Sequence, residues 1–147
     1  MKKGFSLITA IMFIVLVATI AALALSLSST SSKQTTDLYL REQAELLLQS
    51  GTEFALLAIS GHDIDATGTC INTMDIQYPT VAAPLFDISI TLSYMGSGLP
   101  AAGCTNILSN TVVTPESNVT VIIDTIVTDH SLSTEPIRLH RRTIQKP

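Results

Sequence analysis

The first third of the chain consists of an apolar run followed by an amphipathic one. No charged residue occurs over residues 4–32, and residues 7–27 are apolar except for two threonines and one serine. A helix of these 21 residues would be about 32 Å long, which matches the roughly 30 Å hydrocarbon core of a bilayer. The pattern therefore predicts a membrane-spanning helix over residues 7–27.

After the apolar run the spacing becomes that of a helix with two different faces. Apolar or small residues recur at alternating steps of four and three, which is helical spacing. They are Leu40, Ala44, Leu47, Gly51, Phe54 and Ala58, with Leu48 and Ala55 beside them. Gly51 should weaken the helix locally by about 1 kcal/mol relative to Ala, and Gly61 is suited to end it. We expect one continuous helix over residues 5–60, apolar in its first half and amphipathic in its second.

Beyond Gly61 the period changes from that of a helix to that of a strand. Residues 86–94, 119–128 and 137–143 each alternate, whereas residues 62–79 are rich in turn formers and predict no clear element. The second of these strands is partly apolar on both faces, so we place it centrally. The sequence predicts an α+β fold, in which a head over residues 61–147 packs an antiparallel sheet against the outer half of the helix.

Composition excludes two broad classes. Hydrophobic residues make up 46% of the chain and charged residues only 14%, where about a quarter is usual, so the chain is not disordered as a whole. A formal net charge of −4 argues against a basic nucleic-acid binder, and no nucleic-acid partner is expected.

The charge is unevenly distributed. Eleven acidic residues and no Lys or Arg lie between Glu42 and Glu135. The last segment is basic and holds Arg138, Arg141, Arg142 and Lys146. We treat the three arginines as a candidate basic patch. Either they pair locally within the fold, or they contact neighbouring copies of the chain.

Two cysteines, Cys70 and Cys104, lie in the part that the sequence places outside the cytoplasm. Lys2 and Lys3 precede the apolar run and should hold that end in the cytoplasm. In an oxidising compartment the cysteines should form a disulfide, which would enclose 33 residues. The loop-entropy contribution is about 4 kcal/mol. Zinc is not expected, because the CxxC spacing of zinc sites is absent.

The N-terminal order of two lysines, Gly4, Phe5 and a long apolar run resembles the class III signal of type IV pilins and pseudopilins. The resemblance covers about the first 30 residues. It implies that a prepilin peptidase cuts between Gly4 and Phe5 and that the new amine is methylated. It further implies an anchor in the lipid of the bacterial inner membrane, a periplasmic head, and later assembly with other pilin or pseudopilin subunits into a periplasmic or extracellular filament.

Thr9 departs from the family pattern. Most members carry Glu at this position. Its carboxylate pairs with the positively charged N-terminal amine of a neighbouring subunit, because a buried charge needs such a partner. Thr9 therefore indicates a minor subunit located near the filament tip. The alternative is that Thr9 is a tolerated polar residue in the major subunit of a filament.

Two other classes stay open. One is a secreted domain, whose conventional signal would be cut after Ala24. The other is a single-pass anchor that carries a periplasmic binding domain. N-terminal sequencing separates the three, since the mature chain would begin at Phe5, Leu25 or Met1. The choice between a pilus, a type II secretion filament and a DNA-uptake system also stays open.

We expect neither an enzyme nor a cofactor. The three histidines, His62, His130 and His140, lack Cys or acidic residues at the spacing of metal sites or catalytic triads. Asp63 and Asp65, with Asp75, could be calcium ligands, but loop carboxylates more often form turns or face solvent.

Overall fold

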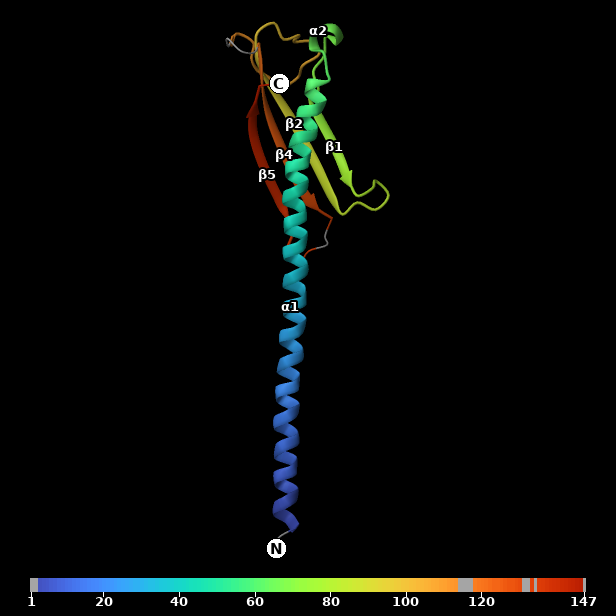
Figure 1. Cartoon of the computed structure of the whole chain (residues 1–147), viewed down its shortest axis with the longest axis vertical. Helices are drawn as coiled ribbons and strands as arrows, with labels where there is room; N and C mark the ends of the chain where they lie inside the picture. Colours follow the sequence, from blue (N-terminus) through green and yellow to red (C-terminus); the bar gives the residue numbers. More distant parts are fainter. Residues whose placement is uncertain (1–2, 114–117, 131–132, 134, 147) are drawn as a thin grey trace. The chain divides into compact units, whose positions relative to one another are not determined.

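A computed structural model of the chain describes the backbone of residues 3–113, 118–130, 133 and 135–146, and the side chains from residue 7 on (Figure 1). These residues form helices α1 (Lys3–Ser60) and α2 (Ile64–Thr67) and five strands. The strands are β1 (Thr73–Tyr78), β2 (Phe86–Gly96), β3 (Ile107–Ser109), β4 (Val119–Asp129) and β5 (Arg138–Gln145). The chain separates into two compact units, Met1–Tyr39 and Leu40–Pro147.

The first unit is the apolar half of α1. Every large apolar side chain over residues 7–27 is more than half exposed to solvent. The hydroxyl of Thr19 donates to the backbone oxygen of Leu16 at 2.8 Å, so this polar group is satisfied within the helix. α1 is long and apolar enough to cross a membrane, and it therefore fits a membrane anchor or a signal, as predicted.

The second unit contains the sheet, whose strands lie in the order β1-β2-β4-β5 with antiparallel pairing. Short β3 pairs in parallel with the end of β2. The predicted central position of β4 is confirmed, because it lies between β2 and β5. β1, β3 and α2 were not predicted: β1 alternates polar and apolar residues, but over only six positions among turn formers, and β3 and α2 are too short to show a period. The predicted α+β architecture is confirmed.

The core lies between the sheet and the outer half of α1, as predicted. Alternate residues of β2 and β4 are buried, and the helix contributes a stripe of small and aliphatic residues. The stripe is Leu40, Ala44, Leu48, Gly51, Ala55 and Ile59. Phe54, which the sequence pattern places in the apolar stripe, is instead 49% exposed. The buried face is therefore turned slightly from the predicted one.

Gly51 lets the helix approach the sheet closely. A Cβ at this position would lie 3.1 Å from Cγ2 of Ile88 and 3.2 Å from Cγ2 of Thr125. Next to it, the hydroxyl of Thr52 donates to the oxygen of Leu48 at 3.0 Å and lies 3.3 Å from the hydroxyl of Thr125. The cost of Gly51 in helix stability is thus offset by helix–sheet contact, which the sequence pattern does not show.

Candidate functional site

The predicted processing residues Gly4 and Phe5 lie in the first turns of α1, but their side chains are outside the described residues. Thr9 is half-buried and borders a shallow hollow of about 260 Å³ with Met12, Phe13 and Leu16. No acidic residue occurs over residues 5–36. The helix therefore offers an apolar surface here, with hydroxyls but no carboxylate.

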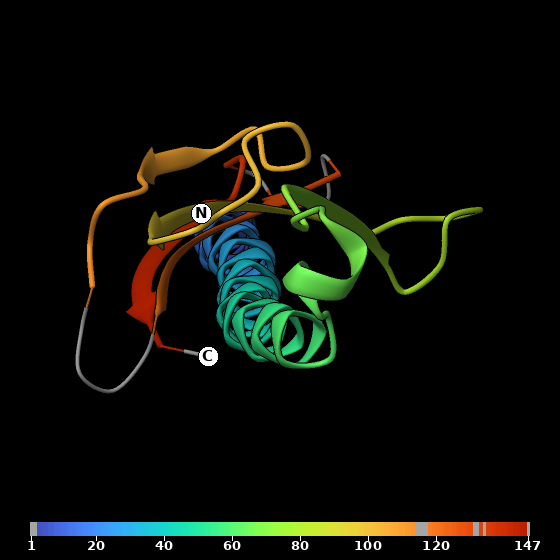
Figure 2. The same cartoon turned by 90° about the horizontal axis from the view of Figure 1, so that it is seen from above.

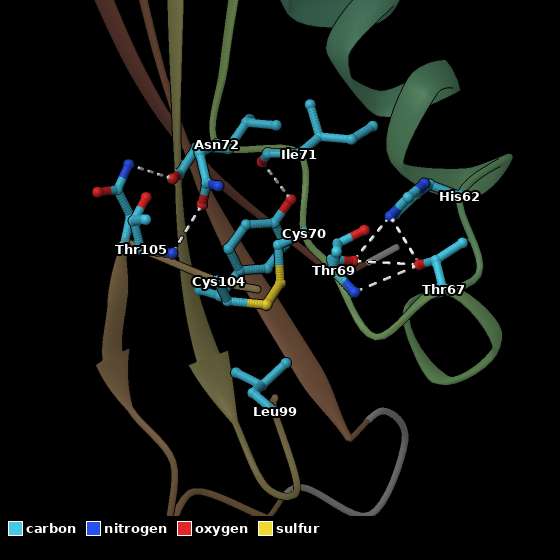
Figure 3. Close-up of a disulfide and its surroundings, with 12 residues drawn as sticks. His62, Thr67, Thr69, Cys70, Ile71, Asn72, Leu99, Cys104 and Thr105 are labelled. Atoms are coloured by element: carbon cyan, nitrogen blue, oxygen red, sulfur yellow. Dashed lines mark hydrogen bonds between the residues drawn. A yellow bond between two sulfur atoms is a disulfide. The ribbon is translucent and has the colours of Figure 1, made fainter. Parts of the chain in front are cut away.

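The predicted disulfide between Cys70 and Cys104 is confirmed, with the two Cα atoms 4.8 Å apart (Figure 3). It joins the segment after α2 to the loop after β2. The backbone nitrogen of Cys70 also donates to the oxygen of Gly103 at 3.1 Å. A Cβ on Gly103 would lie 2.2 Å from the backbone oxygen of Gly68, so only glycine fits beside the disulfide.

Three asparagine side chains fix the loops around the disulfide. Asn110 accepts from the backbone nitrogen of Leu99 at 2.8 Å and donates to its oxygen at 3.0 Å. Asn72 accepts from the nitrogen of Thr105 at 3.0 Å (Figure 3), and Asn106 donates to an oxygen of β2 at 3.1 Å. These bonds join residues far apart in sequence, so no local pattern could have predicted them.

Tyr94 ties β2 to the segment next to the disulfide. Its ring is almost fully buried, and its hydroxyl donates to the backbone oxygen of Ile71 at 2.7 Å. Burial raises the pKa of Tyr94 to about 12. The tyrosine is therefore neutral at physiological pH and acts as a buried structural donor.

The end of the head near α2 carries a polar hollow of about 320 Å³. It is bordered by the end of α1, by α2 and by residues 97–99 and 118–119. Asp63 caps α2 by accepting from the nitrogen of Ala66 at 3.0 Å, which gives it a structural role. Asp75 lies on β1 and accepts from the hydroxyl of Ser89 at 2.8 Å. Among the described residues, no group of three His, Cys, Asp or Glu could hold a metal ion, so the calcium hypothesis gains no support.

The candidate basic patch is divided between the two faces of β5. In the register of β4 against β5, Arg141 lies opposite Thr125, whose side chain points toward α1. Arg138 lies opposite Thr128 and Arg142 lies opposite Asp124, so both are on the other face of the sheet. The reason is the period of two in a strand, which puts residues 138 and 142 on one face and 141 on the other. The three arginines therefore do not form one basic face.

Arg142 and His140 both contact the carboxylate of Asp124 across the two strands. The Nε of Arg142 donates to Asp124 Oδ2 at 2.7 Å, its Nη2 also contacts Oδ2, and His140 Nε2 contacts Oδ1. Burial alone would raise the pKa of Asp124, but these two partners outweigh it and lower its pKa below the ordinary value. For Arg142, the interpretation as local pairing within the fold therefore holds.

Comparison with profiles of protein families, with curated proteins and with solved structures finds no match to this chain. An apolar N-terminal helix and a disulfide-bonded sheet packed on its outer half are consistent with a pilin-like fold. The apolar helix indicates a membrane anchor or signal, and the disulfide indicates an extracytoplasmic head.

Proposed function

We propose that this chain is a structural subunit, a minor pilin or pseudopilin, of a type IV pilus-like or type II secretion filament. It is held in the bacterial inner membrane with its N-terminus in the cytoplasm and its head in the periplasm before assembly. It acts by assembly and not by catalysis, and it needs no cofactor. Its partners are the prepilin peptidase, membrane lipid and other subunits of the filament.

The observation that carries the proposal is the apolar half of α1, exposed along 7–27 and preceded by two lysines, Gly4 and Phe5. The exposed side chains need lipid or neighbouring helices around them, because water disfavours so much apolar surface. A subunit that moves from the membrane into a filament core would have both environments in turn. The glycine before Phe5 would give a protease access to the backbone beside the membrane.

The experiment is N-terminal sequencing of the mature protein, together with the variant Gly4→Leu. A filament subunit should begin at Phe5, and Gly4→Leu should leave the full-length precursor in the membrane. Ala10→Leu, a bulky replacement further along, is the control and should be processed normally. A mature chain that begins at Leu25 would indicate a secreted domain, and one that retains Met1 would indicate a plain anchor.

The assignment as a minor subunit rests on Thr9. In an apolar core of low dielectric constant, each incoming N-terminal amine gains from a nearby carboxylate. This chain supplies none over residues 5–36, so it suits a position near the tip, where fewer subunits need that carboxylate.

The test of this assignment is subunit stoichiometry in sheared filaments, measured by quantitative mass spectrometry. We expect low copy number for the natural chain and a higher one for Thr9→Glu, whereas Thr9→Val should change nothing. If the natural chain makes up the bulk of the filament, the assignment as a minor subunit is wrong.

A further inference from the structure

The part of α1 that packs on the sheet has a second, uncovered face. Figure 2 looks along the helix and shows the strands on one side of it, with the other side open. Glu42, Leu46, Glu53 and Leu57 follow one another at steps of four, seven and four, so they share one side of the helix, which we call the helix face. Leu46 is 68% exposed and Leu57 is 70% exposed.

The helix face is acidic as well as apolar. Glu42 and Glu53 are exposed, and Glu53 accepts a hydrogen bond from Gln49 at 3.2 Å. In the described part of the chain neither carboxylate forms a salt bridge. Two glutamates and two leucines on one uncovered face are suited to a partner that carries both cations and apolar surface.

The edge strand β5 offers such a surface. β5 is the last described strand in the sheet order. It carries Arg138 and the 65% exposed Ile144 on its outer face and Arg141 on the face toward α1, and these three side chains flanking the edge are together called the β5 edge. Since Arg142 is paired with Asp124, the two other arginines are the ones left for a partner. Neither of them forms a salt bridge within the residues that the structure describes.

We infer that the helix face of one copy of this chain binds the β5 edge of a second copy. The inference rests on the proposed function for its choice of partner, because a subunit of an assembly has copies or related chains as neighbours. The charges are complementary, with two carboxylates on one surface and two guanidinium groups on the other. Each surface also offers at least one exposed aliphatic side chain.

The two surfaces also match in length. The helix face runs over 16 residues from Glu42 to Leu57, whose ends are 15 rises of 1.5 Å, or about 22 Å, apart. The β5 edge runs over seven residues from Arg138 to Ile144, whose ends are six rises of 3.3 Å, or about 20 Å, apart. Because the surfaces differ from each other, the contact is heterologous and can repeat from copy to copy. It requires at least two adjacent copies, which is compatible with a low copy number but not with a single copy.

The test uses charge reversal on the full chain in detergent, with self-association measured by sedimentation. The edge variant is Arg138→Glu/Arg141→Glu, and the face variant is Glu42→Arg/Glu53→Arg. Each variant alone brings like charges together, so each should associate at least about tenfold more weakly than the natural chain. An equimolar mixture should recover association to within about threefold, because the reversed edge of one chain meets the reversed face of the other.

Two controls keep the result specific. Lys33→Glu/Arg41→Glu changes the net charge as much as the edge variant does but lies outside both surfaces, and it should associate as the natural chain does. Arg138→Gln/Arg141→Gln removes the charges without creating repulsion, and its weaker association should lose most of its dependence on salt. Thermal unfolding of every variant should show that the head is folded.

Three outcomes would overturn the inference. The edge variant could associate as tightly as the natural chain, the mixture could fail to recover association, or the natural chain could stay monomeric at tens of micromolar. In the last case the β5 edge would bind a different subunit, or its charged side chains would only prevent unwanted pairing with other strands. None of these outcomes bears on processing at Phe5, so failure of the inference and failure of the proposed function are distinguishable.

Discussion

The two units treat the same kinds of side chain in opposite ways. In Met1–Tyr39, leucine, isoleucine and valine side chains are more than half exposed, whereas Phe86, Ile90 and Leu92 of the second unit are fully buried. The second unit buries a core within the chain, although Leu46 and Leu57 stay exposed, whereas the first unit needs lipid or other chains to bury its apolar surface. The difference shows that the first half of α1 is suited to an apolar environment, whereas its second half is suited to packing on a sheet in water.

Polar groups follow the same division. In the first unit, Thr19, Ser29 and Thr30 donate to backbone oxygens three or four residues earlier, so their hydroxyls need no partner outside the helix. In the second unit, Asn110 and Tyr94 bond to backbone groups of remote segments. The first solution suits a helix in an apolar medium, and the second fixes a tertiary structure.

The largest effect should come from removing the disulfide of the second unit. Cys70→Ser/Cys104→Ser should lower the free energy of unfolding of the head by about 4 kcal/mol, since the unfolded chain regains the freedom of a long loop. Urea titration of the full chain in detergent measures it. Reduction of the natural protein should give the same loss, and a reduced protein as stable as the oxidised one would contradict the prediction.

A matched pair of substitutions tests whether the first unit lies in the membrane and the second in water. Leu16 is 54% exposed in the first unit and Leu46 is 68% exposed in the second. Leu16→Asp should disfavour membrane insertion by about 3 kcal/mol, because a carboxylate in hydrocarbon is costly. Leu46→Asp should leave insertion unchanged. The readout is the fraction of the chain that resists extraction from membranes at alkaline pH. If both variants are extracted equally, the two units do not differ in their environment.

Much of the fold could be predicted because its signals are local. The apolar run over residues 7–27 and the alternation over 86–94 and 119–128 each have one period along a continuous stretch. β1 also alternates, with Met74 and Ile76 half-buried, but its period extends over only six residues between turn formers, so its signal is weaker. The bonds of Asn72 and the space around Gly103 depend on segments remote in sequence, which no local pattern records.

The candidate site residues also differ in whether local sequence or remote segments determine their arrangement. The pairing of Cys70 with Cys104 could be predicted because the chain has only two cysteines. The division of the arginines between two faces follows from strand periodicity, but the partner of Arg142 depends on the register of β4 against β5. Processing at Gly4 and the role of Thr9 stay predictions.

Gly51 gives a test of the helix–sheet contact that distinguishes the second unit. Gly51→Leu should destabilise the head by about 1–3 kcal/mol, because the new side chain would overlap Ile88 and Thr125, even though leucine favours helix more than glycine does. Ser50→Leu is the matched control on the exposed neighbour and should change stability by less than about 0.5 kcal/mol. Unfolding of the full chain by urea measures both, and equal stability of the two variants would mean that the close contact is absent.

The smallest effect should come from the polar surface of the second unit. Asp124→Asn should cost about 1 kcal/mol or less at neutral pH, since its partners Arg142 and His140 are more than half exposed to solvent. The native pKa of Asp124 is lowered, so its contribution is present above the ordinary aspartate pKa and is lost as the pH falls through the native value.

The stability difference between the natural chain and Asp124→Asn should therefore shrink toward zero in acid. Urea titrations at several pH values from 7 to about 2 measure it. A difference that stays constant down to the lowest pH would mean that the contacts of Arg142 and His140 with Asp124 do not stabilise the fold. Burial between helix and sheet would then account for the stability of the head without help from this surface network.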